Sequence, residues 1–224
     1  YIMSFRQNNT VIIEPRETHK ASIIWLHGLG ADGHDFESIV PELYLPSKLG
    51  IRFIFPTAPI RKITINNNMK MRGWYDIKAT NLREMEDVNS ITESSNLIHN
   101  YINAEIKKGI KSDKIIVAGF SQGGAIALHS GIRYPSKLAG ILALSSYLPL
   151  PENLEREASG NKEIPIIMAH GRDDNIIPIE QGRSSCQTLI ENGYKIRWNE
   201  YSMQHTICSE EILMIRSWIK NQLS

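Results

Sequence analysis

The sequence predicts an α/β fold in which helices cover both faces of a mostly parallel sheet. Short apolar runs rich in β-branched residues are typical of strands buried on both faces, and they alternate with helical segments along nearly the whole chain. The 224 residues contain no repeat and no linker-like stretch. A chain of this length is long for one core and short for two, so we expect residues 1–224 to form one domain.

Composition restricts the class of protein. A hydrophobic fraction of 42% and a charged fraction of 22% are typical of a soluble globule, and a net charge of +1 argues against a nucleic-acid partner. No apolar stretch approaches the roughly 18 residues that span a bilayer. The first residues lack the regions of a signal peptide, and Cys186 and Cys208 cannot form a disulfide framework. We therefore expect a cytoplasmic protein.

The first half of the chain is predicted to contain strands and one short helix. In order, these are a hairpin of residues 3–7 and 10–14, a strand at 22–27, a helix at 35–43 and a strand at 51–55. Asn8 and Asn9 tolerate the positive φ of a tight turn, which favours the hairpin. In the helix, Phe36, Ile39 and Leu43 fall on one face.

A long segment at about residues 56–80 has no helical periodicity. Apolar and polar residues alternate around Asn67, which predicts a hairpin-like loop. Loops this long are usually lids or binding loops. The apolar and basic residues at 60–72 are also compatible with contact to an anionic membrane surface, and a hairpin that only caps the core is the third alternative.

The second half continues the alternation of helices and strands. The predicted order is a helix at 87–108, a strand from 115 that leads into a helix ending near 134, a strand at 138–144, an exposed connection at 150–163, a strand at 164–169, a helix at 179–192, a strand at 196–201 and a final helix from 209. Ile91, Ile98, Ile102 and Ile106 form the buried stripe of the first helix, and Gly109 is suited to end it. In the final helix, we expect Ser209 as the N-cap and burial of the apolar positions 212, 215, 218 and 219.

The sequence Gly-Phe-Ser-Gln-Gly at 119–123 has the form of a nucleophile elbow. A strand precedes it and a helix follows it, which counts against a chance occurrence of the motif in a loop. Gly119 and Gly123 flank Ser121 so closely that side chains there would clash. The Ser121 hydroxyl should therefore project above the sheet, and the next N–H, that of Gln122, begins a helix whose positive end favours an oxyanion.

The loop at 27–33 follows a strand and contains His27 and several glycines. It is suited to supply the second oxyanion donor, the backbone N–H of Leu29. Its glycines also match the dinucleotide pattern G-x-G-x-x-G. No acidic residue follows on a second strand about 20 residues later, so we disfavour a dinucleotide site.

A serine nucleophile needs a base, and the base needs a carboxylate, in the chain order serine, acid, histidine. His205 is the one histidine beyond the last predicted strand, which favours it as the base over a surface histidine. Asp173 and Asp174 both follow a strand, and their spacing does not choose between them. No metal-ligand spacing is present, so we expect no metal and no cofactor. Cys208 lacks an elbow, which favours a packed thiol over a nucleophile.

Five separated motifs together resemble one family. They are LHGLGA at 26–31, PTAP at 56–59, GWYD at 73–76, GFSQGG at 119–124 and HG at 170–171. The chain resembles the small carboxylesterases related to acyl-protein thioesterases and lysophospholipases, which have the α/β-hydrolase fold. The resemblance implies Ser121 as nucleophile, His205 as base and Asp174 as acid. It selects Asp174 because the family pattern places its acid there, with Pro178 in register.

The resemblance also implies roles around the triad. Leu29 and Gln122 would be the oxyanion donors, and Trp74 and Tyr75 would shape the acyl pocket, which would place the hairpin-like loop at about 56–80 near the active site. Arg172, Asn175 and Ser146 depart from the family pattern. None is a triad position, so the departures leave the expected chemistry in place and make the local turn geometry and the substrate preference less transferable from the family.

We therefore expect a serine hydrolase that cleaves acyl esters or thioesters through an acyl-enzyme. The motifs do not separate the two bonds, and the substrate would be a small or lipid-like acyl compound or an acylated protein. We expect a monomer or a weak homodimer, with peripheral membrane contact through the 60–72 loop. A non-catalytic binding protein and a serine peptidase of the same fold are the alternatives.

Overall fold

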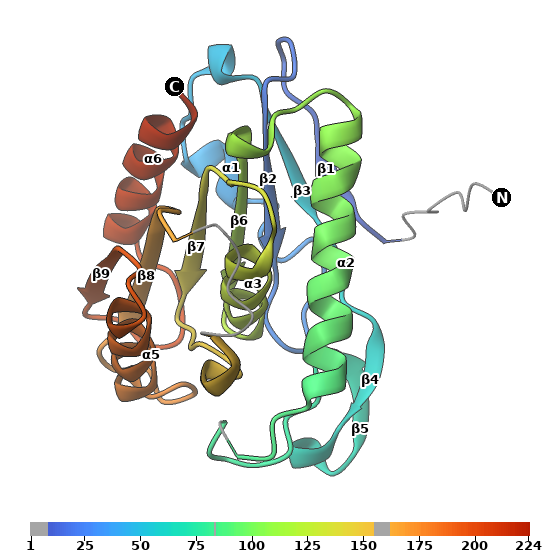
Figure 1. Cartoon of the computed structure of the whole chain (residues 1–224), viewed down its shortest axis with the longest axis vertical. Coiled ribbons are helices and arrows are strands. Elements are labelled where there is room, and N and C mark those ends of the chain that lie inside the picture. Colours follow the sequence, from blue (N-terminus) through green and yellow to red (C-terminus); the bar gives the residue numbers. More distant parts are fainter. Residues whose placement is uncertain (1–8, 83, 155–161) are drawn as a thin grey trace, which may run out of the picture.

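The computed structural model describes residues 9–82, 84–154 and 162–224, and its centre is a seven-stranded sheet (Figure 1). The strands, in their order across the sheet, are β1 (Val11–Ile13), β3 (Ile51–Phe55), β2 (Ala21–Leu26), β6 (Ile115–Phe120), β7 (Gly140–Leu144), β8 (Ile166–Gly171) and β9 (Ile196–Tyr201). β1 is antiparallel to β3, and the other neighbours are parallel. The predicted α/β class is confirmed.

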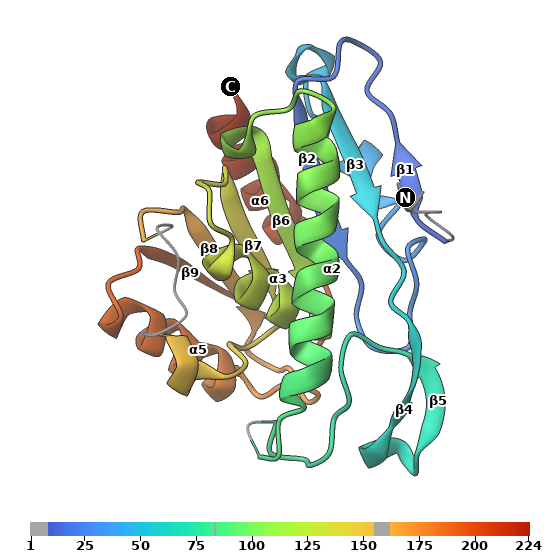
Figure 2. The ribbon, with the colours of Figure 1, turned by 45° about the vertical axis from the view of Figure 1, so that its right-hand side comes forward.

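Helices cover both faces of the sheet (Figures 1 and 2). They are α1 (Ile39–Glu42), α2 (Val88–Lys107), α3 (Gln122–Arg133), α5 (Ile179–Glu191) and α6 (Ser209–Leu223), with single 3₁₀ turns at Ser47–Leu49, Thr64–Asn66, Ser112–Lys114 and Pro151–Asn153. α2, α3 and α5 pack on one face, and α1 and α6 on the other. None of the helices in the described part of the chain is long and apolar enough to cross a membrane.

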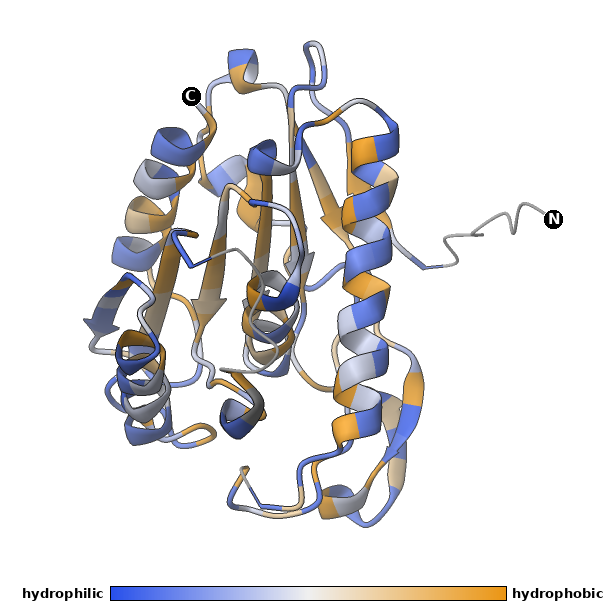
Figure 3. Ribbon diagram, viewed as in Figure 1, coloured by the Kyte–Doolittle hydropathy of each residue, from blue (hydrophilic) through white to orange (hydrophobic). Residues whose placement is uncertain are grey.

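The central strands contribute side chains to both layers of core. In β2, Ile24 and Leu26 face the α2 side, whereas Ile23 and Trp25 face the α6 side. Successive side chains of a strand point to opposite faces, so a strand covered on both sides is apolar without alternation. Figure 3 shows this continuous hydrophobic colouring along the middle of the sheet.

The helix expected at 35–43 is wrong in extent, because only Ile39–Glu42 is helical. The residues before it form turns in which Ile39 N–H bonds Phe36 O and Val40 N–H bonds Glu37 O. An α-helix through this segment would need the N–H of residue 41 to bond Glu37 O. That residue is Pro41, which has no N–H to donate.

Other expectations differ in detail. The connection at 150–163 is not simply exposed, since Leu150 and Leu154 are buried, and residues 155–161 lie outside the described part. Ile106 is exposed although it was assigned to the buried stripe of α2. β1 pairs with β3, while the expected partner at 3–7 lies outside the described residues. Cys208 rather than Ser209 is the N-cap of α6, and Ile212 is only half-buried.

A two-stranded hairpin of β4 (Ile60–Ile63) and β5 (Met69–Arg72) lies apart from the main sheet (Figure 2). Its turn contains Asn67 and Asn68 at φ of 53° and 58°, a conformation that asparagine tolerates better than most residues. Asp76 fixes the tip, because its carboxylate accepts the N–H of Thr64 at 2.7 Å and the hydroxyl of Thr64 at 2.6 Å. The hairpin is therefore tied to the chain that follows it.

The direction of strand addition reverses around β2. β3 lies on one side of β2 and β6 on the other, and open α/β sheets bind ligands at the carboxyl ends of strands at such a point. Leu26 at the end of β2 is in register with Gly119 near the end of β6. The loop from His27 and the turn at Ser121 consequently leave the same edge of the sheet side by side.

Candidate active site

Ser121 occupies a strained turn between β6 and α3. Its φ of 55° and ψ of −124° are unusual for a residue with a side chain. A Cβ on Gly119 would lie 2.3 Å from the Gly123 carbonyl, and a Cβ on Gly123 would lie 2.3 Å from Leu26 O. Both glycines are thus needed for the backbone to fold this tightly, which is the steric reason for the motif.

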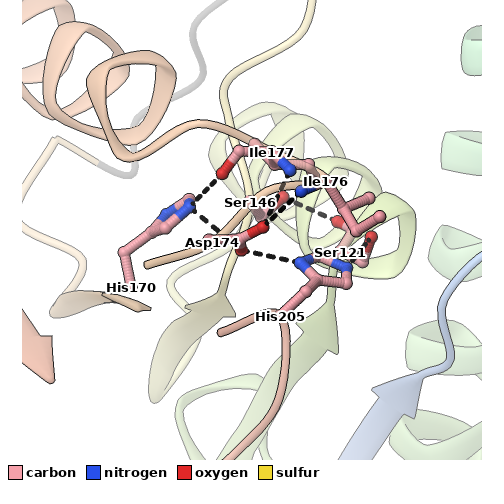
Figure 4. A network of polar contacts seen from close by, with 7 residues as sticks. All are labelled: Ser121, Ser146, His170, Asp174, Ile176, Ile177 and His205. Carbon is pink, nitrogen blue, oxygen red and sulfur yellow. Dashed lines mark hydrogen bonds and ion pairs between the residues drawn. The ribbon is translucent and has the colours of Figure 1, made fainter. Parts of the chain in front are cut away.

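The structure brings together three of the predicted residues from the ends of three strands (Figure 4). Ser121 Oγ lies 2.9 Å from His205 Nε2, and His205 Nδ1 lies 2.7 Å from Asp174 Oδ2. A carboxylate only accepts hydrogen bonds, so Nδ1 carries a proton and Nε2 is left to accept the Ser121 hydroxyl. The arrangement is suited to general-base activation of the serine.

Asp174 is held as an anion by its surroundings. Its Oδ1 accepts the N–H groups of Ile176 and Ile177, each at 2.9 Å, and its Oδ2 lies 3.4 Å from His170 Nε2. Burial alone would raise the pKa of Asp174, but hydrogen bonds from His170, His205 and these two N–H groups outweigh it and keep the pKa well below its usual value.

Asp173, the alternative acid, does not face His205. Its side chain is exposed, and its backbone N–H bonds Met203 O at 3.1 Å. His170 is an additional partner of Asp174 that the sequence reasoning used only as part of a motif. It is buried, and its Nε2 also lies 2.8 Å from Ile177 O, so it links Asp174 to the following turn.

The two predicted oxyanion donors lie on the two adjacent loops. Gln122 is the first residue of α3, so its N–H has no partner within the helix. In the other loop, the N–H of Gly30 bonds Arg72 O at 2.8 Å, while the N–H of Leu29 has no partner among the described residues. A Cβ on Gly28 would lie 3.5 Å from the Cβ of Ser121, which measures how closely this loop approaches Ser121.

The side chain of Gln122 performs a task that sequence reasoning missed. Its Oε1 accepts the N–H of Trp74 at 2.7 Å and its Nε2 donates to Tyr75 O at 2.7 Å. All three residues are buried. No local signal could reveal this link, because Gln122 and Trp74 are 48 residues apart in the chain.

His27 anchors the loop at 27–33, which contains Leu29. Its Nε2 accepts the N–H of Ala58 at 3.0 Å, so its proton is on Nδ1, which donates to Gly28 O at 2.6 Å. Trp74 Nε1 donates to His27 O at 2.9 Å. Burial lowers the pKa of His27, which keeps the ring neutral in this role.

Trp74 and Tyr75 are buried beside Gln122 and His27. Trp74 is 0% exposed and Tyr75 is 3% exposed, and the Tyr75 hydroxyl bonds that of Tyr147 at 2.6 Å. Burial raises the pKa of Tyr75 well above its usual value. Their contacts support the backbone around Gln122 and His27, and direct contact with substrate stays a prediction.

A cavity of about 310 Å³ opens beside His205. Its walls include Phe36 and Phe120, and the ring of Phe120 lies 4.7 Å from the ring of His205 between centroids. Asp35 and Glu42 stand at its edge with exposed side chains. Neither aromatic residue is among the site residues that the sequence predicts, because Phe36 falls on the apolar face of an expected helix and Phe120 is only a variable position of the elbow motif.

Two other chemistries have little support. Among the described residues, no group of three or more histidine, cysteine or acidic side chains could hold a metal ion. Burial raises the pKa of both Cys186 and Cys208, which disfavours a thiolate nucleophile.

The sheet order, the reversal at β2 and the elbow after β6 define an α/β-hydrolase, and the chain is a hydrolytic enzyme. More particularly, it belongs to the Phospholipase/Carboxylesterase family, whose profile matches residues 7–223.

Relatives and solved structures agree with this membership. The acyl-protein thioesterase 1 of Neurospora crassa is 41% identical over 92% of this chain and 88% of that protein, and that of Schizosaccharomyces pombe is 42% identical over 82% of each. The crystal structure of Arabidopsis thaliana SOBER1 superposes with a TM-score of 0.87 at 32% identity, covering 92% of this chain and all of that one. Zea mays acyl-protein thioesterase 2 gives 0.84 at 27% identity, covering 96% and 99%.

Proposed function

We propose that the protein cleaves carboxylic esters or thioesters of acyl chains, those on acylated proteins included, through an acyl-enzyme on Ser121. The observation that carries the proposal is the unbroken hydrogen-bonded chain from Asp174 through His205 to Ser121 at the carboxyl edge of the sheet. Relatives named acyl-protein thioesterase support the acyl-thioester part of this substrate class.

The geometry supports a two-stage reaction. His205 Nε2 takes the Ser121 proton as Oγ attacks the acyl carbonyl carbon, and the N–H groups of Leu29 and Gln122 bind the resulting oxyanion. Each such donor typically contributes about 3 kcal/mol to lowering the barrier. The tetrahedral intermediate collapses as His205 gives its proton to the leaving oxygen or sulfur. Water then attacks the acyl-enzyme by the same route, with Asp174 stabilising the imidazolium each time.

The leaving group should lie on the side of His205, because that residue must reach it with a proton. The cavity lined by His205, Phe36 and Phe120 is on this side. We infer that it receives the alcohol or thiol portion of the substrate. The carboxylates of Asp35 and Glu42 at its edge would favour a leaving group that carries positive charge.

The β4–β5 hairpin is suited to contact the acyl chain or a membrane surface. The side chains of Ile60 and Met69 are 60% and 62% exposed. The two strands also carry the basic residues Arg61, Lys62, Lys70 and Arg72. The hairpin is joined to the loop at 27–33, which contains the proposed donor Leu29, through the hydrogen bond from Gly30 N–H to Arg72 O. Exchange of Ile60 and Met69 for serine should lower activity on long acyl chains more than on acetate.

The matched control for the hairpin is Ile190→Ser, which removes an exposed isoleucine from α5. An equal loss on short and long chains in the hairpin variant, or the same loss in the control, would contradict an acyl-chain role. Binding to vesicles that contain anionic lipid, measured by sedimentation, separates membrane contact from acyl recognition.

The test of the function is hydrolysis of p-nitrophenyl esters from acetate to laurate and of an S-palmitoylated peptide. Wild type should act with a rate that depends on chain length, and Ser121→Ala should be inactive. Ser217→Ala, which alters an exposed serine on α6, should keep full activity. An inert wild-type protein that still binds these esters would instead indicate a non-catalytic binding protein.

A further inference from the structure

We propose that Ser146 is a positioning residue for the oxyanion hole. Its hydroxyl donates to the backbone carbonyl of Ser121 at 2.7 Å, and its side chain is 1% exposed (Figure 4). This contact touches the nucleophile's own peptide group rather than its side chain. The inference rests on the proposed function, because it assigns a role within the same reaction.

The peptide group between Ser121 and Gln122 connects this contact to the chemistry. A trans peptide is planar, and its C=O and N–H point in opposite directions. The carbonyl belongs to Ser121 and the N–H to Gln122, one of the two oxyanion donors. Fixing the direction of the carbonyl therefore fixes the direction of the donor.

Two donors hold that carbonyl. One is the N–H of Ala125 at 3.2 Å, the first bond of α3, and the other is the hydroxyl of Ser146. The Ser121 N–H, on the other side of the residue, bonds Leu144 O at 2.9 Å. Residues at and just after the end of β7 therefore hydrogen-bond both the N–H and the C=O of Ser121.

The space for the Ser146 side chain depends on Gly124. A Cβ on Gly124 would lie 2.7 Å from Ser146 Cβ and 2.9 Å from its Oγ. The first turn of α3 can approach Ser146 only because Gly124 has no side chain. The hydroxyl is therefore enclosed, and water is poorly placed to replace it as a donor to Ser121 O.

The neighbouring residue Ser145 provides a matched control. It is 0% exposed, like Ser146 it follows β7, and its Oγ has no hydrogen-bond partner among the described residues. Ser145→Ala and Ser146→Ala delete the same atom from adjacent buried positions. Only the second deletion removes a bond to the nucleophile's peptide.

The experiment compares kcat, KM and inhibition by an acyl trifluoromethyl ketone in these variants. Such a ketone adds to Ser121 and leaves an oxyanion in the hole. Ser146→Ala should lower kcat about three- to tenfold with KM unchanged, which is the typical effect of one neutral hydrogen bond. The inhibition constant should rise by the same factor as kcat/KM falls, while Ser145→Ala stays within twofold of wild type.

Ser146→Cys separates hydrogen bonding from packing. A thiol fills the site but is a weak donor, so we expect this variant to keep most of the loss seen in Ser146→Ala. Full recovery in Ser146→Cys, or equal losses in the Ser145 and Ser146 alanine variants, would overturn the inference. An unchanged kcat in Ser146→Ala would do the same while leaving the serine hydrolase intact, whereas an inert wild type would overturn the proposed function itself.

Discussion

Replacing Gln122 by methionine should separate stability from chemistry at this site. Methionine is close to glutamine in length and volume but has no amide. The change leaves the Trp74 N–H and the Tyr75 carbonyl without their partners in a buried region. The backbone N–H of residue 122, the proposed oxyanion donor, is retained.

The loss of stability can be estimated from these two bonds. An unsatisfied buried donor or acceptor costs about 1–3 kcal/mol, and the two costs overlap, so we expect a loss of about 3 kcal/mol. For a chain of 224 residues, 1 kcal/mol corresponds to roughly 2–4 °C in Tm, so the midpoint should fall by about 6–12 °C. At 20 °C, well below unfolding, kcat should remain within about fivefold of wild type, because the proposed oxyanion donor and the proposed triad are unchanged.

Thermal unfolding by circular dichroism and ester hydrolysis at 20 °C measure the two effects. Gln187→Met is the control, since the side chain of Gln187 is exposed on α5 and hydrogen-bonds only the side chain of Glu191 among the described residues. Its Tm should move by less than about 2 °C. A structural role for the Gln122 side chain is refuted if the Tm of Gln122→Met falls no further than that of Gln187→Met, or if Gln122→Met keeps its Tm and loses activity.

Three further predictions concern charge. Asp174→Asn should lower kcat about 10³–10⁴-fold because the amide favours the wrong tautomer of His205, whereas Asp173→Asn, an exposed change, should have no such effect on ester hydrolysis. Burial raises the pKa of Glu211 to about 8, so the folded state retains a proton that the unfolded state releases. Between pH 5 and 8, the free energy of unfolding of wild type, measured in urea, should therefore fall by roughly 3–5 kcal/mol more than that of Glu211→Gln. An equal dependence of the free energy of unfolding on pH in the two proteins would exclude this role of Glu211. Replacing Asp35 and Glu42 by their amides should reduce kcat/KM for a thioester peptide with lysines beside the acyl-cysteine more than for one with serines, and equal changes would remove the charge argument.

The sequence was most informative where structure is set locally. The elbow could be predicted because its glycines, strand and helix are adjacent in the chain, and the apolar strands identified the sheet. The choice between Asp173 and Asp174 could not come from spacing, because it depends on which carboxylate meets the N–H groups of Ile176 and Ile177 in the folded turn.

Contacts between distant segments were beyond such reasoning. The departure at Ser146 was visible in the sequence, but its bond to Ser121 spans 25 residues and depends on the space left by Gly124. The helix expected at 35–43 failed for a local reason that could have been used, since Pro41 lacks the N–H that a longer helix requires.

The placement of His205 after β9 has a consequence for how the enzyme should lose activity. β9 is one of the two edge strands of the described sheet and pairs only with β8 among the described strands, and its side chains are half-buried or exposed. Edges with few neighbours tend to open in sub-global fluctuations before the centre of a fold. Opening of β9 would carry His205, the proposed base, away from Ser121, which stays at the end of the central strand β6. In rising denaturant, catalysis should therefore disappear while the inner sheet is still protected from hydrogen exchange.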